Sequence, residues 1–143
     1  MFVNPSPGEI AQLLRSARTI AVVGLSADPT RPSHGVARAL QRFGYRIIPV
    51  NPALESVLGE PAVASLGQLP EVLGRDERVD IVDVFRRPEH VAALVAECVQ
   101  LRLPALWLQD GVVDHSAAAR AAAAGIFTVM DRCIFKMRAA LDD

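Results

Sequence analysis

Residues suited to binding phosphate gather in one short segment of the sequence. Gly24 and Ser26 follow an apolar run, and Arg31 and Ser33 come just before or at the start of a predicted helix. At a turn of this kind, backbone N–H groups and the positive end of the helix dipole attract anions. Gly24 also allows a close approach to the backbone. The segment predicts a phosphate-binding loop, and an ordinary helix cap is the alternative.

A pair of arginines follows a second apolar run. Arg86 and Arg87 come directly before Pro88, which sets the first turn of another predicted helix. The planar guanidinium fork suits phosphate oxygens, so we expect this pair to share one crevice with the arginine of the first loop. The alternative is that both arginines lie at the surface and pair with Asp83 or Glu89.

Amide groups and an aromatic ring end other apolar runs. Asn51, followed by Pro52, either offers one directed hydrogen bond or forms a rigid turn. Gln109 carries an amide that can bind a ligand, and Gly111 relieves crowding beside it. Phe85 either stacks on a base or fills the core. These residues are further candidate contacts for a nucleotide.

The first loop departs from the dinucleotide-binding fingerprint. Ser26 and Pro29 stand where GxGxxG requires glycine, and the run that ends at Asn51 supplies no carboxylate for a ribose diol. Standard NAD binding is therefore disfavoured. The missing acid also removes an objection to a ribose that carries a phosphate, as in NADP and coenzyme A.

The residue types most often used in catalysis form no recognisable constellation. His34, His90 and His115 each fall in or beside a helix start, and none is paired with a nucleophile. Cys98 and Cys133 lie apart and form no CxxC pair, so neither a metal site nor a dithiol motif is predicted. We expect no enzymatic activity from this chain alone.

Length, charge and hydropathy exclude several classes of function. A chain of 143 residues is the size of one domain, and a formal net charge of −1 argues against binding DNA or RNA. No stretch approaches the roughly 18 uninterrupted apolar residues of a membrane span, and the start carries no export signal. We expect a cytoplasmic protein without membrane or nucleic-acid partners.

The elements that must position these residues alternate along the chain. Five runs are apolar nearly throughout, which is typical of strands buried on both faces: Thr19 to Val23, Arg46 to Val50, Val79 to Phe85, Ala105 to Leu108, and Phe127 to Met130. Helical patterns open with a capping box at Ser6 to Glu9 and continue with stretches that end near Gly44, begin at Pro88, span Ser116 to Ala124, and span Ile134 to Leu141.

This alternation predicts an α/β fold of three layers, α/β/α. We expect a Rossmann-like, doubly wound parallel sheet of five strands in a single domain over residues 1–143. Its core covers about residues 19–133, flanked by the terminal helices. Ligands of such sheets bind outside the carboxyl ends of the strands, where the candidate residues fall.

Five segments in order resemble a known family, the small stand-alone coenzyme A-binding domain proteins, which are similar to the nucleotide-binding domain of succinyl-coenzyme A synthetase alpha subunits. They are Ala21 to Ser26 with Arg31 to Ser33, Ile48 to Pro52, Val82 to Pro88, Trp107 to Gly111, and Asp131 to Cys133. The residues that the resemblance assigns to coenzyme A are Gly24, Ser26, Arg31, Ser33, Asn51, Pro52, Phe85, Arg86, Arg87, Pro88, Gln109 and Gly111.

The resemblance implies a protein that binds coenzyme A or an acyl derivative as a binding or regulatory module. The alternatives are a small NADP-dependent oxidoreductase and an accessory subunit of an acyl-coenzyme A enzyme. Exposure of Trp107 would support the accessory subunit, which would need a protein partner; a homo-oligomer is equally open. Asp110 departs from the family pattern and is expected to point outward, Asp131 to cap the last helix, and Cys133 is a candidate for a mixed disulfide with coenzyme A.

Overall fold

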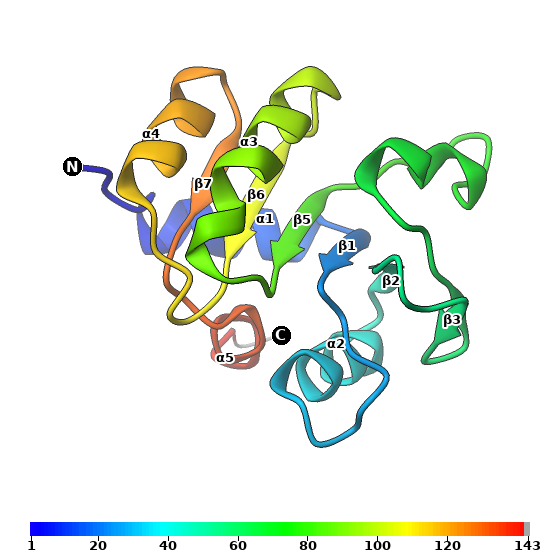
Figure 1. The fold of residues 1–143 in the computed structure, drawn as a ribbon. Helices are drawn as coiled ribbons and strands as arrows, with labels where there is room; N and C mark the ends of the chain where they lie inside the picture. Colours follow the sequence, from blue (N-terminus) through cyan, green and yellow to red (C-terminus); the bar gives the residue numbers. More distant parts are fainter. Residues whose placement is uncertain (142–143) are drawn as a thin grey trace.

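The computed structural model describes residues 1–141, and its centre is a parallel sheet of five strands (Figure 1). The strand order is β2-β1-β5-β6-β7, so the chain starts inside the sheet and winds outward in both directions. The strands are β1 (Thr19–Val23), β2 (Arg46–Val50), β5 (Ile81–Val84), β6 (Ala105–Leu108) and β7 (Phe127–Val129). This confirms the predicted Rossmann-like α/β fold.

Helices cover both faces of the sheet. One face packs against α1 (Pro7–Ser16), α2 (Pro32–Arg42) and α5 (Ile134–Ala139). The other face packs against α3 (Val91–Gln100) and α4 (His115–Ala123). Figure 1 shows α3 and α4 together on one side, with α2 and α5 on the other. No helix in residues 1–141 is long and apolar enough to span a membrane.

The buried strands explain the uninterrupted apolar runs. In β1, Ala21 and Val23 face the α3–α4 side, whereas Ile20 and Val22 face the side of α1 and α2. All are at most 3% exposed. Because side chains of a strand alternate between faces, a strand covered on both sides must be apolar at every position.

Residues 51–80 contain elements that the sequence analysis did not predict. Strands β3 (Ser56–Val57) and β4 (Glu60–Pro61) form a short hairpin, followed by a 3-10 helix, η1 (Leu66–Glu71). Val63 then makes an isolated parallel bridge with Val50, which covers the outer edge of β2. Strands of two residues are too short to show a hydrophobic period, so they cannot be recognised from the sequence.

Local hydrogen bonds account for where the predicted elements begin and end. The capping box is present: Ser6 Oγ accepts from Glu9 N, and the Glu9 carboxylate accepts from Ser6 N. β7 ends at Val129, one residue earlier than predicted, because the Asn4 side chain takes over both backbone bonds of Met130. The N-terminal segment thereby closes this edge of the sheet.

Other predicted boundaries shift as well, including those of α4, which spans His115–Ala123 and not Ser116 to Ala124. β5 begins at Ile81 and ends at Val84, which makes it shorter than the predicted run from Val79 to Phe85. The helix expected at Pro88 opens as a 3-10 turn, η2 (Pro88–His90), before α3. The last helix ends at Ala139 and not at Leu141.

Candidate functional site

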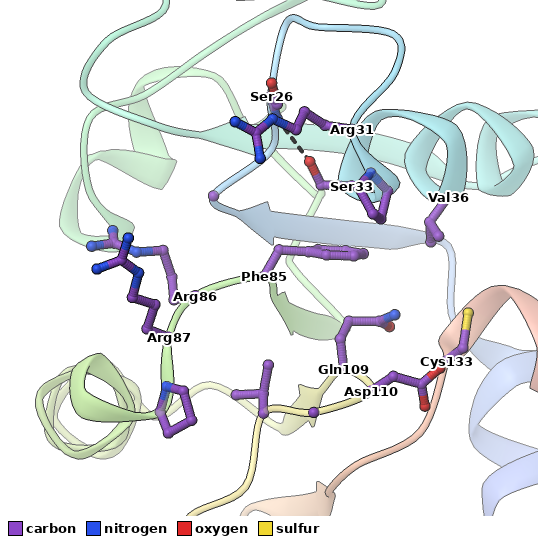
Figure 2. A pocket seen from close by; sticks show the side chains of 15 residues that line it. Ser26, Arg31, Ser33, Val36, Phe85, Arg86, Arg87, Gln109, Asp110 and Cys133 are labelled. Atoms are coloured by element: carbon purple, nitrogen blue, oxygen red, sulfur yellow. Dashed lines mark hydrogen bonds between the residues drawn. The ribbon is translucent and has the colours of Figure 1, made fainter.

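An open pocket of about 800 Å³ lies at the carboxyl ends of β1, β5 and β6 (Figure 2). It is bordered by the loop from β1 to α2, the segment after β5, the loop after β6 and the start of α5. Its lining residues are Gly24, Ser26, Arg31, Pro32, Ser33, Val36, Phe85, Arg86, Arg87, Pro88, Gln109, Asp110, Gly111, Val112 and Cys133.

Ten of these fifteen residues are predicted cofactor contacts, and the fold brings them together. Pro32, Val36 and Val112 are not among the predicted contacts, because apolar residues carry no chemical signal in a sequence. Asp110 and Cys133 were predicted to have other roles. Whether the lining residues hold coenzyme A stays a prediction.

Gly24 joins two of the loops that form the pocket. Its φ is +84°, and a Cβ added there would lie 2.2 Å from the carbonyl oxygen of Phe85. The Gly24 N–H donates to the carbonyl of Val50 at 3.0 Å. Only glycine combines this backbone conformation with so close a neighbour. The residue therefore sets the distance between the first loop and the arginine segment.

The two serines of the first loop hold its shape. Ser33 Oγ accepts a hydrogen bond from Ser26 N at 3.0 Å, and Ser26 Oγ accepts from Asp28 N at 3.0 Å. The Asp28 carboxylate accepts in turn from the Thr30 backbone N–H and hydroxyl, and these bonds lower the pKa of that carboxyl. Each serine hydroxyl keeps its own proton and can still donate to a phosphate oxygen.

Positive charge converges on the pocket. The side chains of Arg31, Arg86 and Arg87 are exposed, line the same pocket and form no ion pair within the described chain. Figure 2 shows Arg86 and Arg87 on one side of the opening and Arg31 above it, beside Ser26. The structure does not support the alternative that the pair is held by Asp83 or Glu89.

Asp83 lies in the interior and not beside the arginines. It is 0% exposed on β5, and neither of its carboxylate oxygens has a hydrogen-bond partner. Complete burial raises its pKa well above the ordinary carboxyl value, because a charged oxygen would lose its hydration without compensation. The carboxyl is therefore favoured in its neutral, protonated form.

The two polar atoms of the Gln109 side chain have different surroundings. The side chain is 4% exposed, and its Oε1 accepts from the Ile134 N–H at 3.0 Å, which anchors the start of α5. Its Nε2 makes no hydrogen bond to any described residue and is directed into the pocket (Figure 2). This leaves an amide donor available to a ligand.

Asp131 has a different role from the predicted cap of the last helix. Its Oδ1 accepts from the Gly111 N–H at 2.8 Å, so it holds the loop after β6. Residue 133 is the N-cap of α5, and its side chain forms no capping bond. The side-chain Oε1 of Gln109 accepts from the Ile134 N–H in place of a capping side chain.

Asn51 and Pro52 are not among the pocket residues. Asn51 Nδ2 donates to the Leu25 carbonyl at 3.0 Å, and its Oδ1 accepts from Ala53 N at 2.9 Å. The amide thus ties the end of β2 to the first loop and forms a turn, which was the structural alternative. The predicted contact of both residues with the nucleotide is not tested by this geometry.

The positions of Trp107 and Asp110 can be compared with those predicted for them. Trp107 is fully buried, and its indole N–H donates to the Arg132 carbonyl at 2.9 Å, so it is a core residue. Asp110 is exposed and is one of the lining residues of the pocket, and the expectation that it points outward stays a prediction. Figure 2 shows its carboxylate at the end near Cys133, away from Arg86 and Arg87.

The sheet, the first loop and the basic pocket at its carboxyl edge define a Rossmann-like α/β domain. A family model described as "CoA binding domain" matches residues 18–139. The chain therefore belongs to the coenzyme A-binding domain family, as the resemblance implied.

One relative by sequence and one solved structure match this chain over nearly its whole length. The chain is 42% identical over 131 residues to the uncharacterized protein YneT of Bacillus subtilis, which covers 92% of this chain and 93% of the relative. A solved structure from Thermus thermophilus, "cell-free ID.343", has a TM-score of 0.85 at 39% identity and covers 94% of this chain and 98% of its own.

A larger neighbour shares the fold. The dinucleotide forming acetyl-coenzyme A synthetase 1 of Ca. Korarchaeum cryptofilum matches with a TM-score of 0.65 at 19% identity, over 81% of this chain and 27% of the synthetase chain. The fold therefore also occurs as one part of a longer chain.

Proposed function

We propose that this chain binds coenzyme A or an acyl-coenzyme A in the pocket at the carboxyl edge of the sheet. The observation that carries the proposal is the convergence of Arg31, Arg86 and Arg87 on one opening in a chain whose net charge is only −1. Without ion-pair partners, three guanidinium groups attract a ligand rich in phosphate. Membership of the coenzyme A-binding domain family supports this choice of ligand.

The two ends of the pocket differ in chemistry, and the two ends of coenzyme A differ in the same way. The nucleotide phosphates would lie against the arginines and the first loop, whose serine hydroxyls can donate to them. The arm that carries the thiol would then run past Gln109 toward Cys133. Asp110, exposed at that end, would repel an acidic acyl group, so a free thiol or a neutral acyl group is the expected occupant.

We further propose that the chain acts as a binding or regulatory module without chemistry of its own. Among the described residues that line the pocket, none is a histidine. No hydrogen bond between described residues joins a cysteine thiol to a histidine or carboxylate that would act as its base. The bound state would be reported through a partner protein or a second copy of the chain.

Calorimetric titration with coenzyme A, dephospho-coenzyme A, NAD and NADP in one buffer tests the proposal. We expect coenzyme A to bind, and loss of its 3′-phosphate to weaken binding. Preference for NADP would replace the proposal with the oxidoreductase alternative. If circular dichroism shows that the protein is folded and none of the four ligands binds, the proposal is contradicted.

A further inference from the structure

Cys133 lies at the end of the pocket that faces away from the arginine pair. It is half-buried, directly precedes α5 and lines the pocket with Gln109 and Asp110. Figure 2 shows its sulfur turned toward the space between Gln109 and Val36, with Arg86 and Arg87 across the opening. A ligand held by its phosphates at one end would therefore extend toward a thiol at the other.

A second observation points independently to a ligand at this end. Gln109 is 4% exposed, and its Nε2 has no partner among residues 1–141 although its Oε1 is fixed by Ile134 N. The nearly buried side chain is thus held in place by its oxygen and presents its amide N–H groups to the pocket (Figure 2). The arm of coenzyme A between nucleotide and thiol carries amide carbonyls, which would accept this bond beside Cys133.

We propose that Cys133 captures coenzyme A covalently, as a mixed disulfide with the thiol of the cofactor. The proposal rests on the proposed function, because the phosphate contacts must first place the sulfur at this end of the pocket. In the step, the Cys133 thiolate attacks one sulfur of oxidised coenzyme A disulfide. The Sγ–S bond forms, the S–S bond of the reagent breaks, and reduced coenzyme A leaves as a thiolate that takes up the proton lost by Cys133.

The second cysteine provides an internal contrast. Cys98 is 0% exposed on α3, and burial, followed by the charge of Glu97, raises the pKa of its thiol to about 12. Since the thiolate is the nucleophile, Cys98 is unreactive in the folded protein. The folded chain should therefore accept one adduct, at Cys133.

Intact-mass measurement of the folded protein tests the proposal. The protein is incubated with coenzyme A disulfide or, separately, with glutathione disulfide, which has the same reactive bond and no nucleotide. We expect one coenzyme A adduct that dithiothreitol removes, formed about tenfold faster or more than the glutathione adduct because binding pre-positions the sulfur. Cys98→Ala should keep the adduct, and Cys133→Ala should lose it.

A second readout uses reduced coenzyme A, which avoids the bulk of the disulfide reagent. Bound coenzyme A should slow the alkylation of Cys133 by iodoacetamide in the Cys98→Ala protein, whereas free pantetheine should not. Adducts at equal rates with both disulfides would reduce Cys133 to an accessible thiol and overturn the proposal. Coenzyme A binding by calorimetry without adduct or protection would also overturn it and leave the proposed function intact, whereas failure of binding itself would remove both.

Discussion

Replacement of Gly24 by alanine tests how the pocket is built. At φ +84° a residue with a Cβ costs about 1–2 kcal/mol more than glycine. The new Cβ would also lie 2.2 Å from the Phe85 carbonyl oxygen, and overpacking of this kind costs about 1–3 kcal/mol. We therefore expect Gly24→Ala to lower the free energy of unfolding by about 2–5 kcal/mol.

Gly35→Ala is the matched control. Gly35 lies inside α2, and a Cβ there would meet nothing within 4 Å. Alanine is the better helix former, so this variant should be equally stable or more stable by up to about 1 kcal/mol. Both variants would be compared with the parent protein by urea unfolding followed by circular dichroism.

The consequence for binding follows from the same contact. Relief of the overlap would push the Phe85 carbonyl, and the arginines that follow it, away from the first loop. Gly24→Ala should therefore also weaken coenzyme A binding while Gly35→Ala leaves it unchanged. A Gly24→Ala protein with the parent's unfolding midpoint would refute the reasoning.

Three further predictions concern charge, capping and the thiols. Because burial raises the folded-state pKa of Asp83, the folded protein keeps a proton that the unfolded chain releases. The contribution of this group to stability is fully present below the ordinary carboxyl pKa of 3.8. It falls as the pH rises from there toward the raised value, by at most about 1.4 kcal/mol per pH unit. Urea unfolding at several pH values should show this slope, and Asp83→Asn should flatten it; an equal slope in both would contradict it. Ser6→Ala removes the capping box and should lower the free energy of unfolding by about 1 kcal/mol in the same assay, and no loss would contradict the cap's role. The pKa of about 12 for Cys98 predicts that a disulfide reagent titrates one thiol in native protein and both in urea; rapid reaction of both in native protein would contradict it.

Much of the sheet could be predicted because burial on both faces leaves an unmistakable pattern. The runs Thr19 to Val23, Arg46 to Val50 and Ala105 to Leu108 match β1, β2 and β6 residue for residue. Once a parallel sheet is predicted, its carboxyl edge follows, and with it the loops that carry Gly24 and Arg86.

Tertiary hydrogen bonding could not be predicted. The roles of Asn51, Gln109 and Asp131 depend on partners distant in sequence, namely Leu25, Ile134 and Gly111. A polar residue at a strand end looks the same in sequence whether it faces a ligand or fixes a neighbouring loop. For Gln109 the structure assigns one half of the amide to the fold and leaves the other half to the pocket.

The contacts that cover the two edges of the sheet could not be predicted either. No strand is predicted between residues 51 and 78, yet Val63 bridges to Val50 and covers the edge of the sheet. A single bridge requires only one residue in register, so no alternation of apolar and polar residues marks it. Asn4 covers the opposite edge with two side-chain bonds to Met130, which are equally invisible in sequence.

Titration of coenzyme A into the parent protein and two double variants tests the central claim most directly. Arg86→Ala with Arg87→Ala removes two charges from the pocket, whereas Arg75→Ala with Arg78→Ala removes two exposed charges outside it and controls for net charge. We expect the first variant to bind more weakly by about 1.5–3 kcal/mol per lost contact, roughly 10- to 150-fold in Kd for one contact, and the second to bind like the parent. Equal affinities in all three proteins would contradict the assignment of this pocket to coenzyme A.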